Sequence, residues 1–383
     1  MQRFQHTADA AVDGRTRDGR GKLSLVPHRD RQVSRLVCRD VTSPLLSEHE
    51  LLAHIAQVFE AAGLIVPRSL LVSYYISLKT NPFVVLAGRD GSITADFAAL
   101  FAEALLGRDS SQYALIPAGA PWPSATGEHG YYRDLRARFA SLRFLDLLQD
   151  AASPAGVGRP YLVCFTSLQP DEVSYYFTSL LRVDDAGQKR LMLPGLALED
   201  CPVVPPNVYI TATLDTVEEV GRLDRQVLRH AALIQLQAVE RSEAPAARLH
   251  APLPVGYQRL WLRSAIRDVD VARQRLAKVL GPDALQRLRC SGELQRLLWR
   301  GGVVIGSREL QELTIYVAAS FDETGRGLFV PSDARRNAQI AFDAQVVQRV
   351  LWKLRDTLDG ELRRDLARFF DRLTPPEVQQ AVA

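Results

Sequence analysis

The sequence is poor in the patterns that build metal sites and disulfides. Its four cysteines are far apart and form no C-x-x-C pair, and its seven histidines show no spacing typical of metal ligands. We therefore expect free thiols in a reducing compartment, and no metal site. The cysteines are Cys38, Cys164, Cys201 and Cys290.

The sequence also lacks a long hydrophobic run and a strong excess of one charge. No apolar stretch approaches the length of a membrane span, and the first residues are polar and charged, unlike a secretory signal. We expect a cytoplasmic protein with no membrane segment. A formal net charge of +3 over 383 residues argues against a molecule that binds nucleic acid through its overall charge.

What the sequence does contain is a series of short, continuous apolar runs separated by segments with helical periodicity. Because these runs do not alternate with polar residues, they are typical of strands that are buried on both faces. The predicted fold class is therefore α/β, with a parallel sheet covered by helices. The runs are Phe83–Leu86, Tyr113–Ile116, Tyr161–Phe165 and Val208–Leu214.

Composition divides the chain into three expected regions. Residues 1–45 are polar and mixed in charge and predict a flexible arm. Residues 46–240 hold the apolar runs, preceded by two helices, and residues 241–383 are mainly helical after a Pro/Ala-rich linker from Ser242 to Pro254. Ser47 and Glu50 have the spacing of a capping box. The clearest helices are expected over 47–63, 67–78, 305–319, 341–358 and 361–373.

The first apolar run leads into the segment with the most chemical information. The run enters a glycine turn, and a helical pattern follows that ends at Gly107. This order is that of a phosphate-binding loop, whose pattern then requires Lys followed by Ser or Thr. Thr94 and Ala95 occupy those positions, so neither the phosphate-neutralising amine nor the Mg²⁺-binding hydroxyl is present. The backbone at Gly88, Gly91 and Ser92 still offers N–H groups, so weak, Mg²⁺-independent nucleotide binding stays open, with no cofactor expected.

The segment from Leu51 to Leu105 resembles the opening of an McrB-like AAA+ NTPase of the MoxR/McrB type. Residues 78–88, Leu-Lys-Thr-Asn-Pro-Phe-Val-Val-Leu-Ala-Gly, resemble the lead-in to the phosphate loop of that family. The resemblance continues to about Leu236 and, more weakly, through the C-terminal helices. It implies an AAA+ P-loop NTPase-like parallel sheet sandwiched by helices, followed by a mainly helical lid domain. Tyr113, Pro117, Trp122 and Gly130-Tyr131-Tyr132 resemble the family's next strand and its Gly-Tyr loop.

The resemblance also assigns the remaining catalytic positions, and most of them are changed. The Walker B strand would be Tyr161–Phe165, with Tyr175-Tyr176-Phe177 at the matching distance beyond it. The Asp and Glu that orient Mg²⁺ and the attacking water would fall at Thr166 and Ser167, with Asp171 and Glu172 nearby. The sensor 1 Asn would be Asp215, the arginine finger His230 (or Arg229 one residue earlier), and the sensor 2 arginine Arg308.

This pattern predicts a catalytically inactive pseudo-ATPase, a structural or regulatory subunit of a restriction or anti-phage defence complex. The expected partners are an active McrB-like ATPase, a nuclease subunit, or both, in a homo- or hetero-oligomer, and DNA is a further possible ligand. Trp299 and Trp352 are expected as core or interface anchors. One alternative is a nucleic-acid-binding module that uses the basic segment 255–300, where Arg259, Arg263 and Arg267 have i, i+4, i+8 spacing. Another is a cryptic ATPase or GTPase that is active only with a partner.

Overall fold

The computed structural model describes most of the compact unit Pro44–Ala383. The expected arm, the Gly-Tyr loop, Tyr175-Tyr176-Phe177, Asp171, Glu172 and nearly all of the Pro/Ala-rich linker lie outside the described residues. The described residues are 46–81, 83–117, 144–170, 173, 189–191, 201–236, 238–242, 256–282, 292–354 and 359–373.

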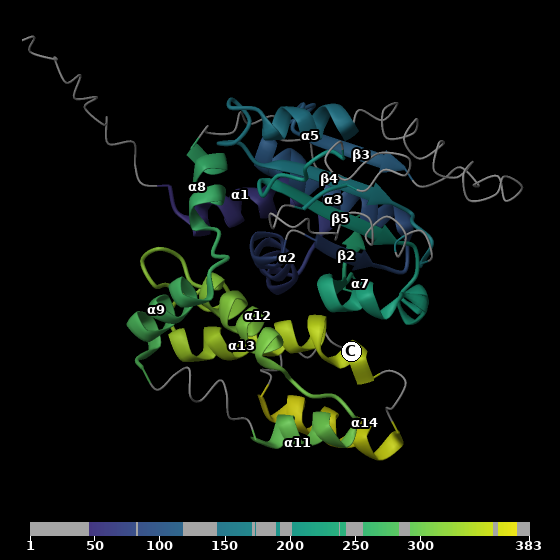
Figure 1. The fold of residues 1–383 in the computed structure, drawn as a ribbon, viewed down its shortest axis with the longest axis vertical. Coiled ribbons are helices and arrows are strands. Elements are labelled where there is room, and N and C mark those ends of the chain that lie inside the picture. The colour runs from purple at the N-terminus through teal and green to yellow at the C-terminus, as the bar shows by residue number, and fades with distance from the viewer. Residues whose placement is uncertain are drawn as a thin grey trace, which may run out of the picture. The chain divides into compact units, whose positions relative to one another are not determined.

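A five-stranded parallel sheet forms the centre of the α/β region (Figure 1). Its order is β3-β4-β5-β2-β6, and every neighbouring pair is parallel. The four apolar runs are confirmed as strands, whereas the fifth strand, β6, was not predicted. The strands are β2 (Phe83–Ala87), β3 (Tyr113–Pro117), β4 (Tyr161–Thr166), β5 (Val208–Leu214) and β6 (Ala232–Gln235).

Both faces of the sheet are covered, which explains why the strands read as continuous apolar runs. Successive residues of a strand point to opposite faces. Val84 and Leu86 of β2 belong to one hydrophobic cluster, and Phe83 and Val85 belong to a second. Strand β4 divides in the same way between the two clusters. The sheet therefore carries an apolar core on each side, as predicted for a buried parallel sheet.

Helices from the first part of the chain cover one face. α1 (Glu48–Ala61) begins with the predicted capping box, in which Ser47 Oγ accepts from the Glu50 N–H and Glu50 accepts from the Ser47 N–H. Gly63, with φ +77°, follows its end. α2 (Arg68–Thr80) and α3 (Gly91–Leu106) complete this layer, while α5 (Phe144–Ala152), η2 (Glu218–Arg222) and α7 (Arg225–His230) supply side chains to the cluster on the other face.

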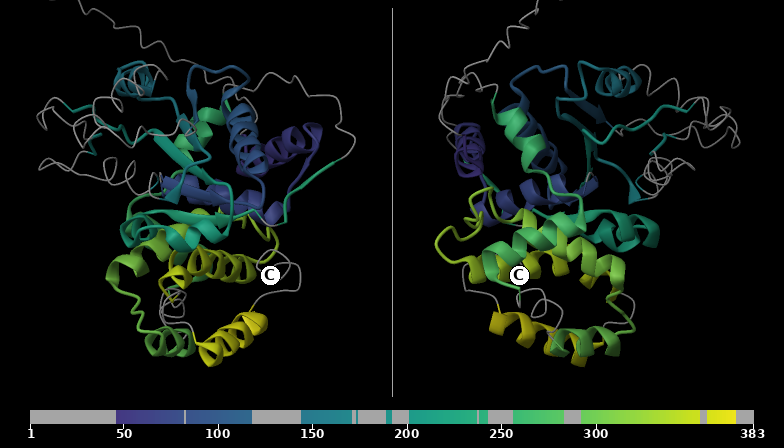
Figure 2. Two further views of the ribbon diagram at one scale, coloured as in Figure 1. Left: turned by 90° about the vertical axis from the view of Figure 1, so that its right-hand side faces the viewer. Right: turned by 60° about the vertical axis from the view of Figure 1, so that its left-hand side comes forward.

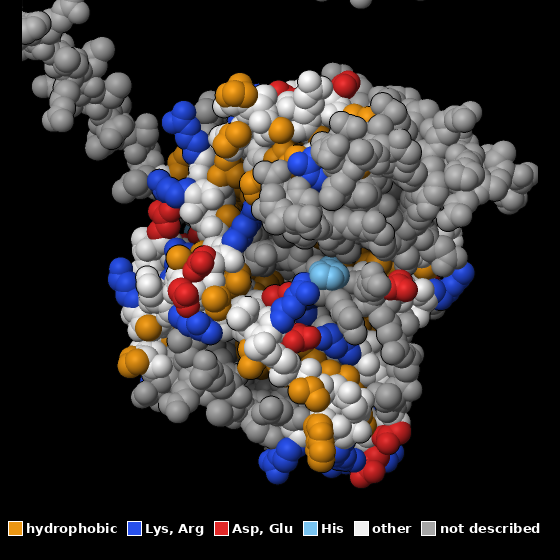
Figure 3. All heavy atoms as spheres, viewed as in Figure 1, with side chains coloured by type: hydrophobic (Ala, Val, Ile, Leu, Met, Phe, Trp, Pro, Cys, Tyr) orange, Lys and Arg blue, Asp and Glu red, His pale blue; other side chains and the backbone are white. Residues whose placement is uncertain are grey.

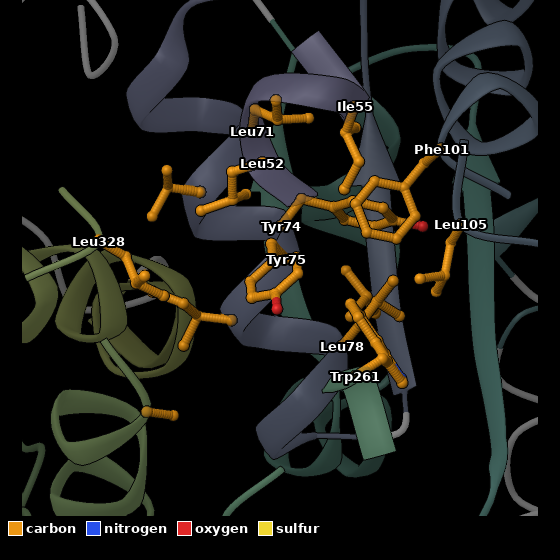
Figure 4. Packing of buried hydrophobic residues seen from close by; sticks show 14 of the residues in the cluster. Leu52, Ile55, Leu71, Tyr74, Tyr75, Leu78, Phe101, Leu105, Trp261 and Leu328 are labelled. Carbon is orange, nitrogen blue, oxygen red and sulfur yellow. The ribbon is translucent and has the colours of Figure 1, made fainter. Parts of the chain in front are cut away.

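Helix α8 (Gly256–Ser264) shares the core of the α/β region although it follows residue 240. Its fully buried Trp261 packs edge-on against Tyr75 of α2 and Phe101 of α3, with ring centroids 5.0 and 5.8 Å apart (Figure 4). Tyr209 of β5 lies 5.4 Å from the same indole. Aromatic pairs of this geometry add to the stabilisation from area burial. Trp261 thus joins two helices, one strand and α8.

The remaining helices are α9 (Val269–Leu280), α11 (Gly292–Arg300), α12 (Ser307–Ala319), α13 (Ala334–Arg349), η3 (Leu351–Leu354) and α14 (Gly360–Leu373). Side chains of α11, α12, α13, η3 and α14 form a third hydrophobic cluster, α9 contributes to the first cluster, and α12 packs against both α2 and α9. Figure 2 shows the yellow-green and yellow helices gathered below the sheet. The helix expected over 341–358 is displaced, because α13 begins at Ala334 after its N-cap Asp333 and ends at Arg349. Among the described residues, no helix has the length and apolarity needed to cross a membrane. A two-stranded antiparallel pair joins β1 (Leu64–Ile65) to β7 (Glu240–Arg241).

Candidate functional site

Three of the positions that the sequence singled out, Gly88, Ser167 and Asp215, meet at one edge of the sheet, whereas His230 precedes β6 and lies at the opposite edge. β2, β4 and β5 are adjacent and parallel, so their carboxyl ends lie at the same edge. Gly88 follows β2, Ser167 follows β4 and Asp215 follows β5. Ligands of open α/β sheets bind outside the carboxyl ends of the strands. This edge is therefore the candidate site.

The loop between β2 and α3 is much shorter than a phosphate-binding loop. β2 ends at Ala87 and α3 begins at Gly91, so only Gly88, Arg89 and Asp90 connect them. Counted from Gly88, the second half of the phosphate-loop pattern, including Thr94 and Ala95, already belongs to the helix. The predicted order of strand, loop and helix is confirmed, but the backbone forms an ordinary helix start in place of a phosphate cradle.

The first N–H groups of α3 are already used by Asp90. Its carboxylate accepts a hydrogen bond from the Ser92 N–H at 2.8 Å, and hydrogen bonding by the Ser92 side chain and then by this N–H lowers the pKa of Asp90. The N–H groups of Ile93 and Thr94 donate to the Asp90 carbonyl at 3.1 and 3.2 Å. Asp is among the preferred N-cap residues because it satisfies these donors. A phosphate at Ser92 would therefore have to displace a carboxylate.

Thr94 fills space and does not point to a ligand. It is fully buried, and its hydroxyl donates to the Gly91 carbonyl at 2.9 Å. A Cβ on Gly88 would stand 2.6 Å from the Thr94 methyl group, so the glycine allows this close contact. The residue at the lysine position of the pattern therefore serves as packing between the loop and the first turn of the helix.

Asp215 places a negative charge against the loop. A Cβ on Gly91 would lie 2.1 Å from Asp215 Oδ1, so the carboxylate rests directly on the glycine. Oδ1 is buried and has no hydrogen-bond partner. Two like charges about 4 Å apart near a protein surface repel by about 4 kcal/mol. A helix N-terminus offers an anion only about 0.3–1 kcal/mol, so the repulsion decides against phosphate at this position.

The two positions that the resemblance assigns to Walker B carry hydroxyls, and the backbone that follows β4 is hydrogen-bonded to Thr213 of β5. Thr166 is buried at the end of β4. The Ser167 N–H donates to Thr213 Oγ1 at 2.9 Å, and the Leu168 N–H donates to the Thr213 carbonyl at 3.0 Å. Ser167 has φ +54°, an unusual backbone conformation for a residue with a side chain. Neither Thr166 nor Ser167 supplies a carboxylate to a metal ion or a water molecule.

The structure adds one carboxylate that the sequence analysis missed. Glu219 accepts hydrogen bonds from the N–H groups of Asp215 and Thr216, both at 3.2 Å, and its own N–H donates to Thr216 Oγ1 at 3.3 Å. This reciprocal pair has the Thr-x-x-Glu spacing of a capping box and lies just before η2, whose N-cap is Val217. Asp90, Asp215 and Glu219 therefore place three carboxylates at the candidate site.

Two positions assigned to different catalytic roles contact each other. Arg308 of α12 donates to His230 Nδ1 at 2.9 Å, although 78 residues separate them. Burial lowers the pKa of His230, and the neighbouring Arg308 and Arg349 lower it further, so the ring is neutral and accepts this bond. Asn81 also donates to the His230 carbonyl at 2.7 Å. His230 thus joins α7 to α12 within one chain. Its imidazole is engaged by this bond, whereas the arginine-finger role that the resemblance assigns to this position would require the side chain to reach a neighbouring subunit.

The i, i+4, i+8 spacing of the three arginines would place them on one helix face, but only Arg259 and Arg263 lie on a helix. α8 ends at Ser264, which leaves Arg267 beyond the helix, 5.5 Å above the ring of Tyr209. Arg263 forms a two-pronged ion pair with Glu323, at 2.6 and 2.9 Å. Arg259 is exposed on α8. The spacing of the arginines alone could not show that the helix ends at Ser264, before Arg267.

The face of the molecule that Figure 3 shows carries charges of both signs. Figure 3 shows Lys and Arg side chains interspersed with Asp and Glu side chains over α12 and α13. In the described part of the chain, no cluster of three or more His, Cys, Asp or Glu side chains is placed to hold a metal ion.

A scan against protein-family models and a search of curated proteins both found no match for this chain.

Proposed function

We propose that this chain is a catalytically inactive, McrB-like AAA+ pseudo-ATPase that acts as a structural or regulatory subunit of a restriction or anti-phage defence complex. The observation that carries the loss of activity is the carboxylate of Asp215 on Gly91. An NTPase site must place positive charge or backbone donors at this point, because it stabilises phosphate oxygens in the transition state. Here the same space is filled by a negative charge.

The topology supports the AAA+ part of the proposal. The strand that would carry sensor 1, β5, lies between the strands that would carry Walker A and Walker B, β2 and β4. AAA+ proteins have this arrangement. The helices from α9 onward would correspond to the lid domain, but Arg308 of α12 contacts His230 before β6 and does not lie at the edge that holds Asp215. The frame is intact, whereas the charged groups of catalysis are replaced, which is expected when a fold is kept for its shape.

Nucleotide titration tests the loss of activity. We expect the purified protein to show neither Mg²⁺-dependent binding nor turnover of ATP or GTP in calorimetry and phosphate-release assays. Asp215→Asn keeps the shape and removes the charge, so it should permit at most weak binding that Mg²⁺ does not strengthen. Magnesium-dependent turnover by the native chain, lost on substitution of Thr166 or Ser167, would overturn the proposal and establish the cryptic NTPase instead.

Co-expression tests the role as a subunit. The chain would be produced together with an intact McrB-like ATPase or a nuclease encoded beside it, and purified through a tag on the partner. A complex of fixed stoichiometry that changes the partner's NTP turnover is expected. An unrelated hexameric ATPase serves as the control. Recovery of the chain as an inert monomer, with no effect on either neighbour, would contradict the proposed role.

A further inference from the structure

Lys189 and Arg267, here called the cation pair, lie near each other, and the described part of the chain supplies neither with a carboxylate partner. Lys189 is half-buried, and Arg267 is exposed in the connection between α8 and α9. Burial lowers the pKa of the Lys189 ammonium, and the nearby charge of Arg267 lowers it further. A partly buried charge that its neighbour repels is unfavourable unless something supplies negative charge. The cation pair therefore favours an anionic ligand.

Both cations are held near the start of β5. The Arg267 guanidinium carbon lies 5.5 Å from the ring centroid of Tyr209, a buried residue in the first turn of that strand's side chains. The Lys189 carbonyl accepts a hydrogen bond from the Val204 N–H at 2.7 Å, just before β5. Cations that are already in place lose little conformational entropy when a ligand binds.

Arg308 and Arg349 strengthen the positive field beside the cation pair. After burial and these two arginines, the charge of Lys189 also lowers the pKa of His230, so Lys189 lies near their network. Both arginines donate to the carboxylate of Glu312, so one negative charge faces two guanidinium groups. Figure 3 shows Lys and Arg side chains close to a His side chain in the middle of this face. Because the two arginines are already engaged, direct contacts to a ligand would come from the cation pair.

A phosphate group matches this arrangement in charge and in shape. Two cations at one place can neutralise a doubly charged phosphate, and a guanidinium offers paired N–H groups to its oxygens while an ammonium supplies a point charge. At the other edge of the sheet, the three carboxylates of the candidate site repel phosphate.

We propose that Lys189 and Arg267 bind a phosphate group at the edge of the sheet opposite the candidate site. The phosphate belongs either to a nucleic acid or to a small phosphorylated molecule, and the two sources share this chemistry. The site depends neither on the loss of nucleotide hydrolysis nor on the role as a subunit, so its test is independent of the proposed function.

Calorimetric titration with inorganic phosphate at low salt tests the site directly. The native chain should bind phosphate. Lys189→Gln and Arg267→Gln should each weaken binding about 10-fold or more, the effect of losing one charge-assisted hydrogen bond. The matched control is Arg259→Gln, which removes the same charge from an exposed position on α8 and should leave the affinity for phosphate unchanged.

Thermal unfolding gives a readout that a merely structural role of Lys189 would not give. Without phosphate, Lys189→Gln should unfold at a higher temperature than the native chain, because the variant lacks the uncompensated charge. Phosphate should raise the unfolding temperature of the native chain more than that of the variant, since the general effect of the salt is common to both. A variant that unfolds at a lower temperature and responds equally to phosphate would overturn the proposal.

A short oligonucleotide distinguishes the two sources of the phosphate group. If nucleic acid is the ligand, the oligonucleotide binds more tightly than inorganic phosphate, its affinity falls steeply with salt, and both variants of the cation pair weaken it. If the ligand is a small phosphorylated molecule, the oligonucleotide binds no more tightly than inorganic phosphate. Either result supports the site. A native chain that binds neither probe, or an equal loss of binding in Arg259→Gln, would contradict it.

Discussion

Gly327 and Gly91 each lie against a polar side chain, and the two side chains differ in whether their hydrogen bonds are made. A Cβ on Gly327 would stand 2.4 Å from the amide carbon of Asn337, and one on Gly91 would stand 2.1 Å from the Asp215 carboxylate. Asn337 Oδ1 accepts from the N–H groups of Phe329 and Val330, and its Nδ2 donates to the carbonyl and hydroxyl of Ser320. Asp215 Oδ1 has no hydrogen-bond partner at all.

The difference distinguishes a polar side chain that stabilises the fold from one at the candidate functional site. The amide of Asn337 uses all its hydrogen-bonding capacity to hold the segment between α12 and α13, so its burial is compensated. Asp215 Oδ1 lies against Gly91 after β2, and no hydrogen bond compensates its burial. Buried polar atoms without a partner are rare and call for an explanation, so this edge stays the candidate site.

The largest loss of stability is expected on substitution of Asn337, because every polar atom of its side chain is hydrogen-bonded. Asn337→Ala would leave the N–H groups of Phe329 and Val330 and the carbonyl of Ser320 without a partner in the interior. Each such group costs about 1–3 kcal/mol, so the free energy of unfolding should fall by about 4–5 kcal/mol in urea denaturation. The control is Gln339→Ala on the exposed face of the same helix, which should change stability by less than about 0.5 kcal/mol. Equal losses of stability in Asn337→Ala and Gln339→Ala would show that the hydrogen bonds of Asn337 do not stabilise the fold.

Asp343 provides a second uncompensated carboxylate, on the same helix as Asn337. Both of its oxygens are buried without partners, and burial raises its pKa from 3.8 to about 7. The folded state therefore holds a proton that the unfolded state releases, so stability is greatest below pH about 4 and falls as pH rises to about 7. The loss amounts to at most about 4 kcal/mol.

Asp343→Asn carries no titrating group and should remove this dependence. Urea midpoints measured between pH about 4 and pH about 8 should fall for the native chain and stay nearly level for the variant. The variant should therefore be the more stable protein only at the upper end of this range. Parallel curves for the two proteins would show that Asp343 is not the source of the slope.

The two glycines give a direct test of the comparison. Gly327→Ala should cost about 1–3 kcal/mol, because Asn337 cannot move without losing its bonds and the new Cβ would also stand 2.5 Å from the Val330 carbonyl oxygen. Gly91→Ala should cost less, about 1 kcal/mol, because the half-buried Asp215 side chain can turn toward solvent. Adding Asp215→Ala should recover the loss at Gly91, while Asn337→Ala should not recover the loss at Gly327. A Gly91→Ala variant that is as damaged as Gly327→Ala would mean that the Asp215 carboxylate is structural.

The smallest change in stability is expected for the surface ion pair between Arg263 and Glu323. Arg263 and Glu323 are both more than one-third exposed, so their ion pair should contribute less than about 1 kcal/mol. Arg263→Glu should lower stability by this amount, and the swap with Glu323→Arg should restore it. DNA retention should be unchanged in both, in filter binding at low salt. A steep loss of DNA affinity in Arg263→Glu would revive the nucleic-acid alternative.

Local signals explain what the sequence predicted and what was overlooked. The Ser47–Glu50 capping box and four strands are confirmed because capping spacing and continuous apolar runs are local properties. The Thr216–Glu219 box has the same signature and could have been found. β6 is a four-residue run directly after α7, too short to separate from a helix end by periodicity. α13 began earlier than expected because Asp333 caps it, accepting from the Arg336 N–H.

By itself, the sequence determined the order of strand, loop and helix, and it placed Thr94, Thr166 and Asp215 at the positions where the resemblance expects catalytic residues. Only the tertiary structure decided that Asp215 lies on Gly91, that His230 accepts from Arg308, and that Trp299 is exposed. The physical reason is that periodicity and capping act over one or two turns of chain. Contacts between distant residues depend on which helices cover which face of the sheet, and this is settled only when the whole core packs.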